Sequence, residues 1–77
     1  EAIHLDSGDA AAYKDRGKAN LSLGRYEDAV ADLNMAINLS PRFPEAFALR
    51  GRAYLALGRE GPAARDLETA EQLKGGS

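Results

Sequence analysis

Residues 16–39, RGKANLSLGRYEDAVADLNMAINL, return 34 positions later as residues 50–73, RGRAYLALGREGPAARDLETAEQL. When residues 10–43 are aligned with residues 44–77, thirteen of the 34 positions are identical. A fixed period of about 20–50 residues is typical of solenoids, in which each repeat packs only against its neighbours. The repeat therefore predicts two copies of one structural unit, whose function lies in a surface rather than in a catalytic centre.

Helical spacing of apolar residues appears four times, and glycine or proline separates each occurrence. Asp9 is a suitable N-cap for the first helix, and Pro44 suits the first turn of the third. Gly24 and Gly58 are placed to end the first and third helices. No segment alternates with period 2, so the sequence predicts an all-α fold. The expected helices cover about residues 10–23, 26–39, 44–57 and 61–73.

The predicted organisation has three parts: residues 1–9, 10–43 and 44–77. Ala2, Ile3 and Leu5 match residues 36, 37 and 39 at the same offset, so residues 1–9 are expected to be the end of a truncated preceding repeat plus a turn. Residues 44–77 are expected to be a terminal repeat, because Ala64 and Glu71 replace Val30 and Ile37 and give it a more polar outer face. This range includes the Gly-Gly-Ser tail at residues 75–77.

Composition excludes several classes of function. The net charge of −2 and the pI near 5.3 argue against nucleic-acid binding, which requires a cationic face. There is no cysteine, and the single histidine, His4, lacks companions for a metal site. The serines have no evident base partner for nucleophilic catalysis. We therefore expect no enzymatic activity, metal or cofactor. No apolar run is long enough to span a bilayer, so a soluble protein without membrane contact is expected, with the cytoplasm the favoured location.

The repeat resembles the tetratricopeptide repeat (TPR), a 34-residue helix–turn–helix unit with the pattern W-x2-L-G-x2-Y…A-x3-F…P. The resemblance covers essentially the whole chain and implies antiparallel helix pairs stacked as a short right-handed solenoid. In the first repeat the pattern falls on Tyr13, Gly17, Asn20, Ala29, Leu33 and Pro41, and Ala36 is a further match. In the second it falls on Phe47, Gly51, Tyr54, Ala63, Leu67 and Gly75, and Ala70 is a further match.

Small residues at these positions have a mechanical explanation. Gly17 with Ala29, and Gly51 with Ala63, are expected where the two helices of a repeat approach most closely. The leucine of the pattern is replaced by arginine in both repeats, and an aspartate follows each arginine sixteen residues later. These residues, Arg16 with Asp32 and Arg50 with Asp66, are predicted to form ion pairs within each repeat. The alternative is that the arginines face a ligand.

The resemblance also implies a binding surface, because the first helix of each TPR repeat lines a concave groove. The candidate peptide-binding residues are Lys14, Lys18, Leu21, Leu49, Arg52 and Leu55. The first helix of each repeat carries more basic than acidic residues, which favours an acidic peptide or a C-terminal carboxylate. TPR domains that bind the acidic tails of heat-shock chaperones use asparagines where this chain has Lys18 and Leu49, which argues against that role.

The leading hypothesis is thus a non-enzymatic module that binds a peptide segment of another protein. The alternative is a structural or oligomerisation segment of a larger TPR array with no peptide ligand of its own. With only residues 1–9 before the first full helix, the face that includes Tyr13 and Leu21 would be partly bare, which predicts a homodimer through this face. RNA binding is disfavoured because it would require a stronger basic stripe.

Overall fold

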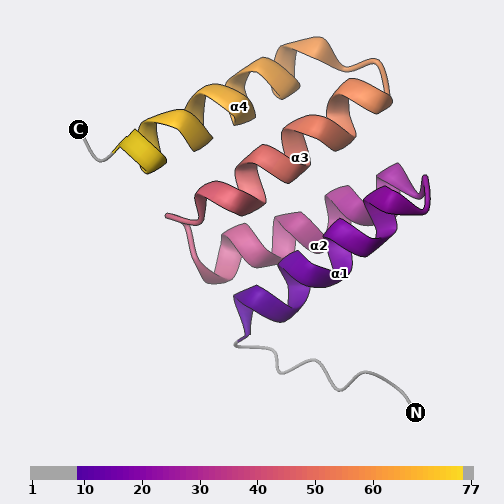
Figure 1. Ribbon diagram of the computed structural model, residues 1–77, viewed down its shortest axis with the longest axis horizontal. Helices are drawn as coiled ribbons and strands as arrows, with labels where there is room; N and C mark the ends of the chain where they lie inside the picture. Colours follow the sequence, from indigo (N-terminus) through magenta and orange to yellow (C-terminus); the bar gives the residue numbers. More distant parts are fainter. Residues whose placement is uncertain (1–8, 76–77) are drawn as a thin grey trace.

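The computed structural model describes residues 9–75, which form four α-helices (Figure 1). The helices are α1 (Ala10–Ser22), α2 (Tyr26–Leu39), α3 (Pro44–Ala56) and α4 (Glu60–Gly75). Every regular element in residues 9–75 is a helix, as the apolar spacing predicted. The expectation that residues 1–8 belong to a preceding repeat lies outside the described residues.

The helix boundaries follow from local chemistry. The Asp9 side chain caps α1 by accepting a hydrogen bond from the Ala12 backbone N–H at 3.1 Å. Pro44 begins α3, where its missing N–H and fixed φ are tolerated. The α4 helix starts at Glu60, one residue before the expected start at residue 61, and continues two residues beyond the expected end. Pro62 lies in its first turn, where no backbone donor is needed.

The first and third helices end in the same way. Gly24 and Gly58 have φ values of 79° and 80°, a conformation that favours glycine. Each follows the helix cap and is accompanied by two backbone hydrogen bonds. At the first turn, Gly24 N–H donates to Leu21 C=O at 3.1 Å and Arg25 N–H donates to Asn20 C=O at 2.8 Å. At the second, Gly58 N–H donates to Leu55 C=O at 3.0 Å and Arg59 N–H donates to Tyr54 C=O at 2.8 Å. This Schellman arrangement satisfies helix-terminal carbonyls and turns the chain back into an antiparallel helix.

The helices pack as two antiparallel pairs, α1 with α2 and α3 with α4 (Figure 1). The α3 helix packs against all three of the others, whereas α4, over the described residues, packs only against α3. The core therefore lies between α2 and α3. Its buried members are Ala29, Leu33, Ala36, Ala46, Leu49 and Ala53, and Tyr13, Leu21, Val30, Ile37 and Phe43 pack around them.

The two glycines inside helices lie where the helices of each pair meet. A Cβ at Gly17 would be 2.8 Å from Leu33 Cγ, and a Cβ at Gly51 would be 2.9 Å from Leu67 Cγ. Ala29 and Ala63 present their backbone carbonyls to the same two glycines. Both helix pairs therefore depend on the absence of a side chain at this contact.

Candidate functional site

Two of the helices, α1 and α3, lie side by side and form a groove. The groove has a volume of about 240 Å³ and is lined by Lys18 of α1 and by Glu45, Ala48, Leu49 and Arg52 of α3. The four α3 residues are spaced i, i+3, i+4 and i+7, which places them on one face of the helix. We call this site the α1–α3 groove.

The charged residues of the groove differ in whether they are already paired. Lys14 lies one turn before Lys18 on α1, and its Nζ is 2.9 Å from an oxygen of Asp15 and 3.4 Å from an oxygen of Glu45. Its side chain is only 14% exposed. The hydrogen bond with Asp15 raises the pKa of Lys14 and lowers that of Asp15. Lys14 therefore connects the first helix pair to the second.

The other two basic residues are differently placed. Lys18 and Arg52 are both exposed, and no carboxylate of residues 9–75 lies within ion-pair distance of either side chain. They line the same groove from opposite helices, above Ala48 and the buried Leu49. The groove thus has two cationic side chains at its sides and an apolar base formed by Ala48 and Leu49. An anionic group could contact both while its neighbouring carbon atoms pack on the apolar base.

The structure brings together three of the six predicted peptide-binding residues: Lys18, Leu49 and Arg52 line the groove. Leu49 is 8% exposed, so it serves mainly as core. Leu21 is half-buried against the core, and Lys14 is occupied by its two carboxylate partners. Leu55 is 50% exposed and is not among the residues that line the groove. The sequence placed Glu45 on the groove-lining helix, where the structure has it, but did not predict its contact with Lys14, which is 31 residues away in the chain.

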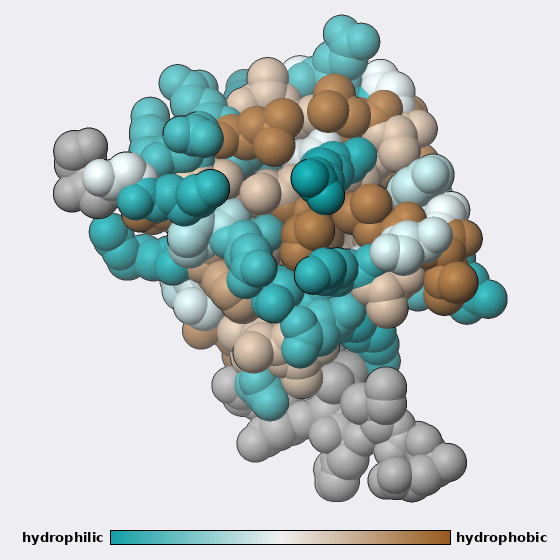
Figure 2. All heavy atoms as spheres, in the orientation of Figure 1, coloured by the Kyte–Doolittle hydropathy of each residue, from teal (hydrophilic) through white to brown (hydrophobic). Residues whose placement is uncertain are grey.

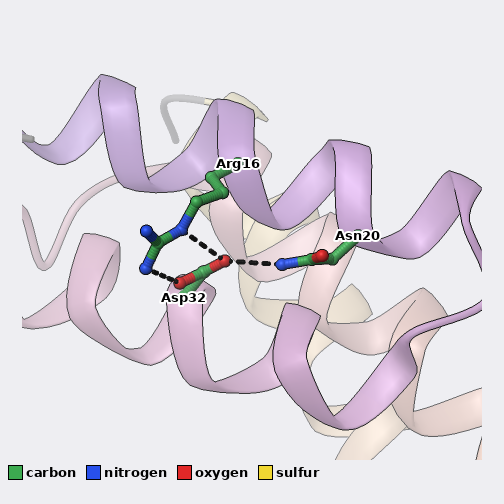
Figure 3. A network of polar contacts seen from close by, with 3 residues as sticks. All are labelled: Arg16, Asn20 and Asp32. Atoms are coloured by element: carbon green, nitrogen blue, oxygen red, sulfur yellow. Dashed lines mark hydrogen bonds and ion pairs between the residues drawn. The ribbon is translucent and has the colours of Figure 1, made fainter. Parts of the chain in front are cut away.

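A polar network fixes α1 against α2 on the side of the helix that holds Arg16 (Figure 3). Arg16 donates from Nε and Nη2 to the two carboxylate oxygens of Asp32, at 3.1 and 2.8 Å. Asn20 donates to Asp32 Oδ2 at 2.8 Å. Together these bonds satisfy a carboxylate that is buried in the core, and the hydrogen bond to Asp32 raises the pKa of Arg16. The predicted pairing of Arg16 with Asp32 is confirmed.

The corresponding network in the second pair has Tyr54 at the position of Asn20 and a contact with Asn34 of α2 instead. Arg50 donates from Nε and Nη2 to Asp66, both at 2.8 Å, and from Nη1 to Asn34 Oδ1 at 2.7 Å. Its guanidinium carbon also lies 5.5 Å from the centre of the Phe47 ring and 5.8 Å from that of Tyr54. Since Asn34 belongs to α2, Arg50 holds the second helix pair to the first. Both arginines are engaged within the fold, which favours the structural interpretation over ligand binding.

Among the described residues, one pocket adjoins the groove and another lies apart from it. The first, of about 410 Å³, is lined by Phe43, Pro44, Glu45, Ala48 and Lys74, where α3 begins and α4 ends. The other, of about 360 Å³, lies at the turn between α1 and α2 and is lined by Gly24, Arg25, Tyr26, Glu27, Asp28 and Leu57. Residues 9–75 contain no group of three or more His, Asp or Glu side chains placed to hold a metal ion. None of the four helices is long and apolar enough to cross a membrane.

The face on which α1 lies in front of α2 shows apolar side chains interrupted by hydrophilic ones (Figure 2). On α1 itself, the position that corresponds to the buried Leu49 is occupied by Asp15, whose side chain is 69% exposed. Its neighbours along the same strip, Ala12 and Ala19, are small. The outer face of α1 is therefore less apolar than the matching face of α3, which lies against α2.

Comparison with known proteins assigns the fold to a family. The family model for the TPR repeat matches residues 17–58, which is more than half of the chain. The chain therefore belongs to the TPR family, and this family membership makes it a protein–protein interaction module of a kind that is typically non-enzymatic. A 47-residue stretch is 43% identical to the protein SGT1 homolog of Oryza sativa subsp. japonica. The match covers 61% of this chain but only 13% of that relative.

Proposed function

We propose that the chain binds a peptide segment of a partner protein in the α1–α3 groove, with an acidic side chain or a terminal carboxylate of the peptide between Lys18 and Arg52. The observation that carries this proposal is the convergence of two cationic side chains, neither paired within residues 9–75, on one groove with an apolar base. Hydrogen bonds between ionised groups are stronger than neutral ones, so they would orient the peptide.

The roles of the predicted residues divide accordingly. Lys18 and Arg52 contact the carboxylate, and Ala48 with the exposed part of Leu49 supports the peptide backbone and side chains. Lys14 contributes indirectly, since it holds Glu45 at the edge of the groove. Glu45 makes the groove less positive than a count of its basic residues suggests. A single acidic residue in the ligand therefore suits the groove better than a run of acidic residues.

The test is an amide-resolved NMR titration with short acidic peptides and with charge-reversed lysine peptides, each at low and high salt. We expect shifts at Lys18 and Arg52 that require the acidic peptide and weaken with salt. The double substitution K18A/R52A should remove these shifts. Arg65→Ala is the control, because Arg65 is an exposed arginine on α4 and does not line the groove.

The same titration tests the alternative of a structural or oligomerising segment. Shifts that follow protein concentration rather than peptide concentration, with a molecular mass above that of the monomer in light scattering, would replace the peptide-binding proposal. Tyr13 and Leu21, on the face through which a dimer was predicted, pack partly against the core, which leaves less apolar surface for this alternative. Binding of acidic peptides that survives K18A/R52A unchanged would also contradict the proposed site.

A further inference from the structure

The α1–α3 groove and the pocket at the start of α3 share part of their lining. Glu45 and Ala48 belong to both, so the two hollows adjoin along one face of α3. The groove continues from them to Lys18 and Arg52, and the pocket continues to Phe43, Pro44 and Lys74. One ligand that lies along α3 would therefore contact both.

The two hollows differ in chemistry. The pocket has a volume of about 410 Å³ and an apolar lining of Phe43, Pro44 and Ala48. Its charged residues are one carboxylate, Glu45, and one ammonium group, Lys74, whose charges offset each other. The groove instead has two cationic groups against the single carboxylate of Glu45, which Lys14 already partly neutralises. The pocket thus favours an apolar side chain, and the groove favours an anionic one.

We propose that the groove and the pocket form one composite site for an extended peptide in which a single acidic residue and a large apolar residue are separated by one position. This inference rests on the proposed peptide-binding function and specifies its ligand. The acidic side chain lies between Lys18 and Arg52, and the apolar side chain lies on Phe43, Pro44 and Ala48.

The separation follows from helix and strand dimensions. Ala48, the pocket residue nearest to Arg52 along α3, precedes it by four residues, about 6 Å along the helix axis, and Pro44 precedes it by eight, about 12 Å. In an extended peptide, alternate side chains point to the same side and are separated by roughly 6.5–7 Å. Residues i and i+2 of the ligand therefore reach from Arg52 to the near end of the pocket at Ala48, where a large side chain can extend toward Pro44, whereas adjacent residues would point to opposite sides.

Glu45 is common to both hollows, so the selectivity between the two positions comes from their cations, which are Lys18 and Arg52 in the groove and Lys74 in the pocket. The carboxylate of Glu45 is held at 3.4 Å from Lys14 Nζ. A second acidic residue, placed at the apolar position of the ligand, would meet this carboxylate and the single cation Lys74, whereas the first acidic residue meets both Lys18 and Arg52. The composite site therefore accepts one acidic residue followed or preceded by an apolar one, and disfavours a pair of acidic residues at the same spacing.

The test uses acetylated and amidated heptapeptides that differ only at the central three residues. Asp-Gly-Phe and Phe-Gly-Asp represent the two directions of binding, and Asp-Gly-Gly, Gly-Gly-Phe, Asp-Gly-Asp and the adjacent pair Asp-Phe-Gly are the comparisons. We expect one of the two directional peptides to bind about tenfold more tightly than Asp-Gly-Gly, from burial of the ring. Asp-Gly-Asp and Asp-Phe-Gly should gain little or nothing over Asp-Gly-Gly.

Amide-resolved NMR on the unmodified chain separates the two hollows without any variant that could fail to fold. The directional peptide should shift the amides of Phe43 and Lys74 together with those of Lys18 and Arg52, and Asp-Gly-Gly should shift only the second group. The K18A/R52A variant should abolish the preference for aspartate, and Arg65→Ala should preserve it. Glu45→Gln should reduce the difference in affinity between Asp-Gly-Phe and Asp-Gly-Asp.

The two proposals fail in different ways. If Asp-Gly-Gly and the directional peptides bind equally, with no shift at Phe43 or Lys74, the composite site is wrong and acidic-peptide binding stands. If Gly-Gly-Phe binds as tightly as Asp-Gly-Phe, the coupling of the two hollows is wrong. If no peptide shifts either group at millimolar concentration, the composite site and the proposed function are both wrong.

Discussion

The two helix pairs have the same internal architecture but different surroundings. In each pair a glycine meets a leucine, and an arginine bonds to an aspartate sixteen residues later. The pairs differ on the face of the first helix that points away from the second helix of the same pair. Leu49 of α3 is buried in the core, whereas the matching residue of α1 is the exposed Asp15. The contacts inside a pair are therefore repeated, and the contacts between pairs are specific to each position.

The same difference is seen on the second helix of each pair. Leu33 of α2 is completely buried, because α2 is covered by α1 and by α3. Leu67 of α4 makes the equivalent contact with its glycine but is only half-buried, because α4, within residues 9–75, packs against α3 alone. Positions that are equivalent in the two repeats are thus buried to different extents. Substitutions at these matched positions measure how much the difference in burial changes the free energy of unfolding.

The largest expected difference comes from truncating these two leucines. Leu33→Ala should lower the free energy of unfolding by about 3 kcal/mol, and Leu67→Ala by about 2 kcal/mol, because the loss grows with the burial of the removed atoms. Urea unfolding followed by circular dichroism measures both. Leu23→Ala is the control, since Leu23 is 68% exposed and its removal should change stability by less than about 0.5 kcal/mol. Equal losses at the two positions would show that α4 is as well covered as α2.

The coupling energy of the ion pairs should also follow burial, but here the second helix pair should have the larger value. The Arg50 side chain is 20% exposed and has Asn34 as a further partner, whereas that of Arg16 is 47% exposed. A double-mutant cycle should give a coupling of about 2 kcal/mol for Arg50 with Asp66 and about 1 kcal/mol for Arg16 with Asp32. Arg→Lys at each site is the matched control, because it keeps the charge and loses the two-point geometry. Coupling near zero in both cycles would mean that neither pair stabilises its helices.

The two close-packed glycines should respond alike, because their surroundings within the pair are alike. Gly17→Ala and Gly51→Ala should each lower the free energy of unfolding by about 1–2 kcal/mol, since overpacking against leucine exceeds the gain in helix propensity. Gly61→Ala tests the propensity alone: no atom lies within 4 Å of its added Cβ, so it should be neutral or stabilising. Thermal unfolding of the three variants gives the comparison. A stabilising Gly17→Ala would mean that Leu33 moves aside without cost.

The smallest expected effect is at Asp15, whose matching position in the second pair is the apolar Leu49. The hydrogen bond from Lys14 lowers its pKa below the ordinary 3.8. Its contribution to stability is therefore present above the unfolded-state pKa and is lost as the pH falls through the lower folded-state value. Comparing acid unfolding of the unmodified chain with Asp15→Asn below pH 4 should show a slightly shallower loss in the variant. No difference would show that the pair with Lys14 contributes nothing.

Much of the fold follows from local sequence signals. Gly24 and Gly58 specify the turns because left-handed backbone is inexpensive only for glycine, and Asp9 and Pro44 specify helix starts. The arginine–aspartate pairs are also predictable, since their spacing repeats with the period. The fourth helix is longer than expected at both ends: it begins one residue earlier, at Glu60, with Pro62 tolerated in its first turn, and it ends two residues later, at Gly75.

The candidate site is less accessible from sequence. Lys14 and Lys18 are indistinguishable in the sequence, being basic residues one turn apart on the same helix. Only the packing of α3 brings Glu45 to Lys14 and leaves Lys18 facing the groove. Likewise, nothing in the repeat pattern indicates that Arg50 reaches Asn34 in the preceding pair.

The sequence alone therefore determined the repeating unit: four helices, their glycine turns, the close contact at each internal glycine and the ion pair inside each repeat. These features depend on residues within one 34-residue period, so their signals are repeated and local. The tertiary structure decided which charged residues remain available, which leucines are buried and where the two hollows adjoin. Those properties depend on which helix covers which face, and that is set by contacts between different repeats, whose residues are not repeated.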